Sequence, residues 1–335
     1  MNILFSCAGR RNYLLNYFRA NLPGEGKIFA TDITPHAPAL TEADDYFIVP
    51  KVQAPDYCEQ LLAICRTHKI KLVISLNDLE LPYLAEVKHK FLEHGIMILI
   101  SEREVIDICF DKYKTADFLN NLNLGTPKTY LTIHSTLQAI ANKEIAFPLI
   151  VKPRWGSASI GIEIANDANE LELAYTWVKN KIQRSILNNV GDIHEAIIIQ
   201  PCLKGIEYGI DIINNLSGTT EAVFIKQKLT MRAGETDRAI TIHNPKIEEM
   251  CRYLGNQLGH IGNLDCDLFE VDGEYYFLEM NPRFGGGYPF SHLAGANIPG
   301  AILAWLKQEQ PLSAWLTVKP NVASSKYDQL VITHG

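Results

Sequence analysis

The sequence contains no long hydrophobic run, which argues against a membrane-spanning helix. The longest apolar segments are short, such as IMILI at residues 96–100, whereas crossing a bilayer takes about 20 residues. The first residues, MNILFSCAGRR, do not resemble a secretory signal, because their apolar stretch is brief and the charges follow it. A formal net charge of −7 and a pI near 5.8 argue against nucleic acid or a membrane surface as partner. We therefore expect a soluble, cytoplasmic globular protein.

Paired cysteines and the common nucleotide-binding glycine motifs are also missing. The seven cysteines show no CxxC spacing, so the sequence predicts neither a disulfide framework nor a zinc site. Gly9 is followed by Arg-Arg-Asn and no GxGxxG occurs, which argues against a dehydrogenase that uses the N-terminal sheet. No GxxxxGK[ST] occurs either, which excludes a P-loop. A nucleotide site in this chain must be built in another way.

The 335 residues, 47% of them hydrophobic, are enough for two or three domains. Residues 1–103 alternate strand-like apolar runs with helical patterns, which predicts a Rossmann-like α/β domain with a parallel sheet. A helical stretch then runs from Ser101 to Gly125, followed by mainly antiparallel strand candidates around one helix. We therefore predict an α+β domain over residues 104–335. Ligands of parallel sheets bind beyond the carboxyl ends of the strands, which nominates Gly9, Arg10, Asp32, Asn77 and Glu80.

The segment DCDLFEVDGEYYFLEMNPRFGGG, residues 265–287, predicts a hairpin that turns at Asp272-Gly273. A two-residue loop would place Asp267 and Glu279 on opposite faces, whereas a three-residue loop would place them on one face together with Asn281. We favour the second arrangement, because Arg283 and three glycines follow at once. Neighbouring carboxylates stay charged when a cation lies between them, and hard oxygen ligands suit Mg²⁺. The alternative is an edge hairpin whose carboxylates face water.

Two further segments carry polar groups at the ends of apolar strands. LIVKPRWGSASIGI places a lysine before a loop of glycines and serines, whose N–H and hydroxyl groups are able to donate to a phosphate. AIIIQPCLKGIEYGID places Gln200 to Leu203 at a strand end, with Glu207 on the next strand. Pro201 removes one N–H there, which leaves neighbouring main-chain groups to pair with a planar base. Each segment alone is more typical of a solvated turn than of a ligand site.

Taken in order, these segments resemble the ATP-grasp superfamily over residues 104 to 305. The resemblance implies an ATP-grasp fold, with ATP and Mg²⁺ or Mn²⁺ as cofactors. It assigns Lys112 and Lys152 to binding of the ATP phosphates. It also implies that the loop with Gly156, Ser157, Ser159 and Gly161 closes over the nucleotide. It assigns Gln200, Cys202 and Leu203 to the adenine, where many members have Glu in place of Gln200, and Glu207 to the ribose. It assigns Asp267, Glu279 and Asn281 to the metal and Arg283, within LEMNPR, to the phosphate.

The run NPRFGGGYPFSHLAGANIP is similar to the carbamoyl-phosphate-synthase-like branch, which includes amino-acid ligases and the lysine ligase of pyrrolysine biosynthesis. Only one ATP-grasp unit is expected. The resemblance implies a carboxylate–amine ligase that forms C–N bonds through an acyl phosphate, with amino acids as the expected substrates and a homodimer as a possible assembly. Lys152, Arg232 and Arg283 would be catalytic, Arg232 facing the phosphate and acyl substrate. The alternatives are an ATP-binding regulatory module without a second substrate and another carboxylate-activating ATP-grasp enzyme.

Overall fold

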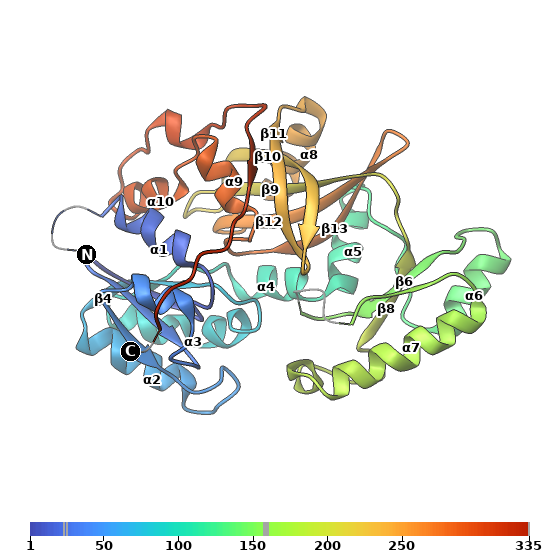
Figure 1. Cartoon of the computed structure of the whole chain (residues 1–335), viewed down its shortest axis with the longest axis horizontal. Coiled ribbons are helices and arrows are strands. Elements are labelled where there is room, and N and C mark those ends of the chain that lie inside the picture. The colour runs from blue at the N-terminus through green and yellow to red at the C-terminus, as the bar shows by residue number, and fades with distance from the viewer. Residues whose placement is uncertain (23, 25, 157–160, 334–335) are drawn as a thin grey trace.

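A computed structural model describes residues 1–22, 24, 26–156 and 161–333 of the chain. It has three sheets, arranged from the N-terminal domain through a large central sheet to a small outer sheet (Figure 1). Among the described residues, every helix is too short or too polar to traverse a lipid bilayer. The predicted combination of α/β and α+β architecture is confirmed.

The N-terminal domain is a five-stranded parallel sheet with the strand order β3-β2-β1-β4-β5. β1, β2 and β4 are mostly buried, as in sheets covered on both faces, whereas the edge strand β3 is largely exposed. The prediction of βαβ units is confirmed here, including the helix at residues 12–19. The elements are β1 (Asn2–Ser6), α1 (Asn12–Arg19), β2 (Ile28–Asp32), η1 (Pro38–Glu42), β3 (Asp45–Ile48), α2 (Tyr57–Thr67), β4 (Ile70–Ser75), α3 (Leu81–Glu93) and β5 (Met97–Ile98).

The predicted single helical stretch from Ser101 to Gly125 is two helices, α4 (Arg103–Phe110) and α5 (Lys112–Asn121). The break lies at Asp111, whose extended backbone cannot continue a helix and whose side chain accepts the N–H groups of Tyr113 and Lys114. The chain leaves α5 well before Gly125, whose carbonyl accepts the Phe277 N–H of the central sheet. Lys112 is therefore the first residue of a capped helix.

The small outer sheet has the order β7-β6-β8, and both pairings are antiparallel. One long helix, α7, packs on it and buries four side chains at helical spacing, which are Leu171, Ala174, Val178 and Ile182. The elements are α6 (Ile133–Ala141), β6 (Leu149–Pro153), β7 (Glu163–Ala165), α7 (Ala168–Gln183), η2 (Ile186–Asn189) and β8 (Ile197–Pro201).

The central sheet has six antiparallel strands in the order β13-β12-β9-β10-β11-β14. One face packs its apolar side chains against α5 and α8, whereas the other faces the N-terminal domain and α9. The elements are β9 (Ile206–Asn214), β10 (Thr220–Arg232), β11 (Glu235–Ile242), α8 (Pro245–Leu258), β12 (Gly262–Val271), β13 (Glu274–Asn281), α9 (Tyr288–Leu293), α10 (Ile298–Leu306), η3 (Ser313–Leu316) and β14 (Ala323–Ser325).

A shared core holds the N-terminal domain to the central sheet. Phe5 and Phe18 of the first domain pack in one buried cluster with Phe284, Tyr288 and Phe224. The rings of Phe18 and Phe284 meet edge to face at 6.0 Å. After β14 the chain runs back across the molecule to the N-terminal domain (Figure 1). Because Phe284 and Tyr288 belong to the shared core, the segment that follows the Asn281 to Arg283 motif is anchored on the N-terminal domain.

Candidate functional site

The hairpin of β12 and β13 places Asp265, Asp267 and Glu279 on one face of the sheet, through a different turn from the expected one. The loop is the two-residue turn, with Asp272 and Gly273 both at positive φ. The expected three-residue loop is therefore wrong. A register shift between Asp267 and Leu268 adds one residue on β13, so that Asp267 pairs with Glu279 after all. Asp265 pairs with Asn281 two residues further along the strands.

The neighbouring strands complete this charged face. Gly209 of β9 lies between Asp267 on β12 and Lys226 on β10. Because Gly209 has no side chain, the Lys228 chain crosses over it, 3.3 Å from where a Cβ would lie. The Lys228 ammonium then reaches the Asp267 carboxylate at 2.6 Å and the Glu207 carboxylate at 2.7 Å. Lys228 thus joins the residue assigned to ribose with one assigned to the metal.

Sequence reasoning missed Lys228, Lys226 and Asp265, although their spacing carried a signal. The two lysines stand two residues apart in the apolar strand TEAVFIKQKL, and Asp265 stands two residues before Asp267. Residues at that spacing share one face of a strand. Lys226 is buried and pairs with buried Asp211, while its ammonium also reaches the Ser291 hydroxyl at 3.1 Å. This pair fixes α9 to the sheet below the site.

A cavity of about 170 Å³ opens over this face. Acidic and basic side chains both line it, and the glycines of the GGG run and of the β10–β11 turn form part of its wall. Arg11 of the N-terminal domain also lines it. The charged lining residues are Arg11, Lys226, Lys228, Glu235, Asp265, Asp267, Glu279 and Arg283.

Lys112 and Lys152 flank the acidic end of the site. The Lys112 ammonium donates to the Gly156 carbonyl and lies 3.8 Å from a Glu279 carboxylate oxygen. Both lysines are at least 90% buried. Burial and the nearby Lys112 charge lower the pKa of Lys152 to about 8. Burial raises the pKa of Glu279, but the two lysines outweigh it and hold that pKa below its usual range.

The pKa values of the paired carboxylates Asp267 and Glu279 are shifted in opposite directions. Burial, together with the charges of Glu279 and Asp265, raises the pKa of Asp267 to about 7 although Lys228 opposes the shift. Burial lowers the pKa of Lys228, and the two acids beside it more than compensate, so that its pKa lies above the usual range. The site therefore concentrates negative charge that a further cation would stabilise.

Arg283 is held by carboxylates from both domains. Its guanidinium donates to Asp78 of the N-terminal domain at 2.6 Å and to Asp265 of β12 at 3.3 Å. Burial lowers the pKa of Arg283, but Asp78 and Asp265 raise it above the usual range. The second oxygen of Asp78 is buried without a hydrogen-bond partner among the described residues. Sequence reasoning missed Asp78, since only its position after β4 pointed to it.

The residues assigned to the nucleotide lie in the outer sheet and at its junction with the central sheet. Gly156 lines a small cavity with Lys112 and Glu279, whereas Ser157 and Ser159 lie outside the described residues. Gln200 is buried and its side-chain amide donates to Thr129 at 2.8 Å. The N–H of Cys202 is not free for a base, since it donates to the Pro148 carbonyl at 2.9 Å. Cys202 and Leu203 are partly buried, and Gly161, in the turn before β7, is buried.

Arg232 lies apart from these groups. It ends β10 and its half-exposed guanidinium pairs with Asp237 at 2.9 Å and with Asp328 of the C-terminal segment at 2.5 Å. Its neighbours Met231 and Ala233 line the cavity, but Arg232 itself does not. The catalytic assignment of Arg232 stays a prediction.

The other nominated residues of the N-terminal sheet form local structure. Asp32 accepts the N–H groups of Gly9 and Thr34. Glu80 is fully buried and accepts hydrogen bonds from Ser6, Ser75 and Tyr57. Burial raises the pKa of Glu80 despite these donors. A carboxyl group so completely satisfied ties β1, β4 and α2 together and offers nothing to a ligand.

The oxygen donors of the hairpin suit Mg²⁺. Across the described stretches of the chain, no group of three or more His, Cys, Asp or Glu side chains is placed to hold a metal ion alone. Asp267, Glu279 and Asn281 supply two carboxylates and an amide, and Mg²⁺ commonly takes one or two carboxylates with the rest of its shell from phosphates and water. The donor set therefore fits Mg²⁺ held jointly with a phosphate-bearing ligand.

Comparison with known proteins bears on the identity of this fold. The model of the PylC-like N-terminal domain matches residues 3–99. The carbamoyl phosphate synthase large chain of Clostridium botulinum is 26% identical over 215 residues, which are 60% of this chain and 19% of that one. Acetyl-CoA carboxylase 1 of Arabidopsis thaliana is 24% identical over 183 residues, or 51% of this chain and 8% of that protein. The chain thus spans about a fifth or less of these relatives.

Solved structures show the same fold along nearly the whole chain. The biotin carboxylase domain of Hydrogenobacter thermophilus 2-oxoglutarate carboxylase, described as a dimer with MgADP, ADP and bicarbonate, has a TM-score of 0.76 at 15% identity and covers 96% of this chain and 73% of that one. An L-amino acid ligase from Bacillus licheniformis has a TM-score of 0.66 at 19% identity, with 95% and 77% covered. The ATP-grasp domain model matches residues 109–287, more than half of the chain, and the chain therefore belongs to the ATP-grasp family.

Proposed function

We propose that this chain is an ATP- and Mg²⁺-dependent ligase that joins a carboxylate to an amine and releases ADP and phosphate. One observation carries the proposal. The carboxylates of Asp267 and Glu279 and the amide of Asn281 line one cavity together with Lys228 and Arg283, and the Lys112 ammonium of α5 lies 3.8 Å from Glu279. Binding of a neutral ligand would not require that density of both signs. The relatives and structural neighbours that act on carboxylates support the same class of chemistry.

The residues have distinct roles in this proposal. Lys112 and Lys152 bind the phosphates, and Gln200 to Leu203 with Glu207 hold the nucleoside. Asp267, Glu279 and Asn281 would hold Mg²⁺, which when bound neutralises charge on the phosphate oxygens. Arg283 would stabilise the charge that develops on the transferred phosphoryl group and the acyl oxygen. Residues 1–103 act as a separate domain that closes the cavity.

The chemistry consists of two displacements. An oxygen of the substrate carboxylate attacks the γ-phosphorus, the bond from that phosphorus to the β–γ bridging oxygen breaks, and ADP leaves with the electron pair. The neutral amine then attacks the acyl carbon, phosphate leaves, and the amine nitrogen loses a proton to give the amide. We assign no protein nucleophile. The protein acts by positioning and charge compensation, as in other phosphoryl transfers.

A panel of amino acids and dipeptides, assayed for ADP and phosphate release, tests the proposal. We expect at least one combination to raise ADP formation well above the rate with ATP and Mg²⁺ alone. The product mixture should contain the matching amide by mass spectrometry. An ATP-binding module without a second substrate would bind nucleotide but show no stimulation by any member of the panel, and that result would reject the ligase.

The lowered pKa of Lys152 predicts that ATP binds more weakly at alkaline pH. Below pH 8 the ammonium is charged in the free protein, whereas above pH 8 it must take up a proton as the triphosphate binds. We expect the Kd for ATP to rise about tenfold between pH 7 and pH 9. Isothermal titration calorimetry in buffers of different ionisation enthalpy would also show the proton uptake.

Lys152→Arg provides the control for this pH dependence. The guanidinium stays charged throughout the range, so the Kd of this variant should change little between pH 7 and pH 9. An equally steep rise in Lys152→Arg would show that another group causes it.

A further inference from the structure

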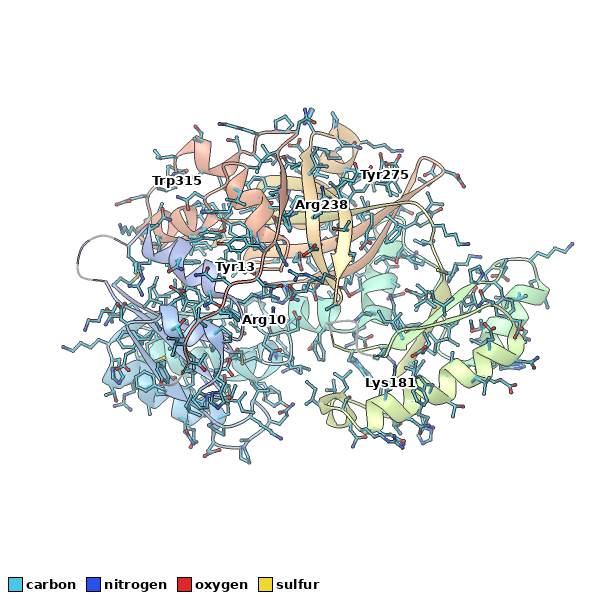
Figure 2. All side chains as sticks on the ribbon, viewed as in Figure 1. Arg10, Tyr13, Lys181, Arg238, Tyr275 and Trp315 are labelled. Atoms are coloured by element: carbon cyan, nitrogen blue, oxygen red, sulfur yellow. The ribbon has the colours of Figure 1, made fainter. Side chains whose placement is uncertain are left out.

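Arg11, at the start of α1, projects from the N-terminal domain into the cavity. Its side chain is 23% exposed, and it meets the wall formed by Glu235 and Gly286. Its neighbour Tyr13 lies at the boundary between the N-terminal domain and the central sheet (Figure 2). The proposed chemistry gives Arg11 no role, since the phosphates and the metal are served by residues of the outer and central sheets.

Most of the donors of Arg11 are unused. Within residues 1–22, 24, 26–156 and 161–333, the hydrogen bond that its guanidinium donates goes to the Tyr13 hydroxyl, at 3.2 Å. Its contact with the Glu235 carboxylate is long, 3.4 Å from Nη1 to Oε1. A guanidinium has five N–H groups in a planar fork that matches a carboxylate. A partly buried arginine with so few bonds is arranged to receive an anionic group.

The negative charge of Glu235 is shared between Arg11 and a second cation, Lys326. The other oxygen of Glu235 lies 3.0 Å from the ammonium of Lys326, in the segment after β14. One carboxylate therefore serves two cations, and the Glu235 side chain is itself 52% exposed. Arg11 is thus left with part of its charge uncompensated, facing the cavity.

Gly286 leaves the space in front of this pair open. A Cβ at this position would lie 3.2 Å from Nη1 of Arg11 and 3.3 Å from a Glu235 oxygen. The backbone of the GGG run therefore passes close to both charges without covering them. Arg283, which precedes this run, lies within the same cavity. A substrate activated beside Arg283 would extend toward Arg11.

We propose that Arg11 binds a substrate carboxylate that is not activated in the reaction, and so selects substrates that carry one. This inference rests on the proposed function of the same cavity. The carboxylate belongs either to the amine substrate or to a second acidic group of the acyl substrate. A carboxylate suits the site better than a phosphate dianion, because one guanidinium beside Glu235 offers at most a single unit of positive charge.

The test replaces each unreactive carboxylate of an active substrate pair by a carboxamide, one at a time. In the unmodified protein one of these replacements should raise KM about 100-fold, the effect of losing a charged, bidentate hydrogen bond. Arg11→Ala should raise KM for the free acid by a similar factor and abolish the preference for it, with KM for ATP unchanged. Arg11→Lys should fall between the two. The replacement that matters shows which substrate carries the group.

Arg19→Ala is the matched control, because it removes the same charge from the same helix at a surface pair with Asp44. It should leave the preference intact. If Arg11→Ala folds and still prefers the free acid over the carboxamide, the proposal is wrong. A purely structural Arg11 would alter stability without altering that ratio.

A second measurement does not depend on turnover. Phenylglyoxal modifies exposed arginines, and peptide mass mapping quantifies its reaction at Arg11. A mixture of free amino acids should protect Arg11, whereas their carboxamides should not. Equal labelling in both mixtures would overturn the proposal even if the ligase reaction is found. Protection without any ADP release would uphold the subsite while rejecting the ligase.

Discussion

Replacing Glu279 by Gln is expected to reduce Mg²⁺-dependent ADP formation by about a thousandfold, the loss of several kcal/mol of charge stabilisation. Gln keeps the shape of the side chain but removes one of the two carboxylates opposed across β12 and β13. It also removes the repulsion that helps to raise the pKa of Asp267. Because Lys112 and Lys152 hold the pKa of Glu279 below its usual range, loss of its charge should lower the unfolding temperature, but the fold should survive. ADP release measured over a range of Mg²⁺ concentrations tests the prediction.

Glu274→Gln supplies the control, since Glu274 begins the same strand but is exposed at the far end of the hairpin. The same chemical change there should leave both ADP formation and its Mg²⁺ dependence unaltered. Should Glu279→Gln turn over as fast as Glu274→Gln, these acids do not serve the metal.

The hairpin shows how far local sequence carries the prediction of this site. Period-two spacing and the Asp-Gly turn are local properties, so the strands and the residues facing the site could be derived from them. The extra residue opposite Asp267 could not, because a bulge depends on how β12 also pairs with β9. The expected grouping of Asp267 with Glu279 came from the wrong loop length, and the register shift restored it.

The contacts between domains lay beyond sequence reasoning for a different physical reason. Asp78 meets Arg283 across 205 residues of chain, and Arg11 meets Glu235 across a similar distance. These contacts follow from the packing of Phe18 against Phe284 in the shared core. The sequence around Asp78 and around Arg11 does not indicate which distant residue each will contact in the folded protein. The strand-end position of Asp78 was the available clue.

The link between Asp78 and Arg283 makes the N-terminal domain part of the reactive centre. Both side chains are less than one tenth exposed, and their closest contact is 2.6 Å. Removing the guanidinium would leave Asp78 and the partly buried Asp265 without their common cation. Breaking a buried pair in this way is strongly destabilising, because a buried charge is left uncompensated. Arg283 should therefore affect stability and turnover by two separable mechanisms.

Arg283→Met is expected to lower the free energy of unfolding by about 3–5 kcal/mol and turnover by about a hundredfold or more. Adding Asp78→Asn removes one of the uncompensated charges, so the double variant should regain much of the stability while remaining inactive. Urea unfolding and ADP release measure the two effects. Arg252→Met, which breaks an exposed pair with Glu248 on α8, should cost less than about 1 kcal/mol and leave turnover intact. If Asp78→Asn restored turnover to Arg283→Met, the guanidinium would be a structural partner of Asp78 and would have no direct part in phosphoryl transfer.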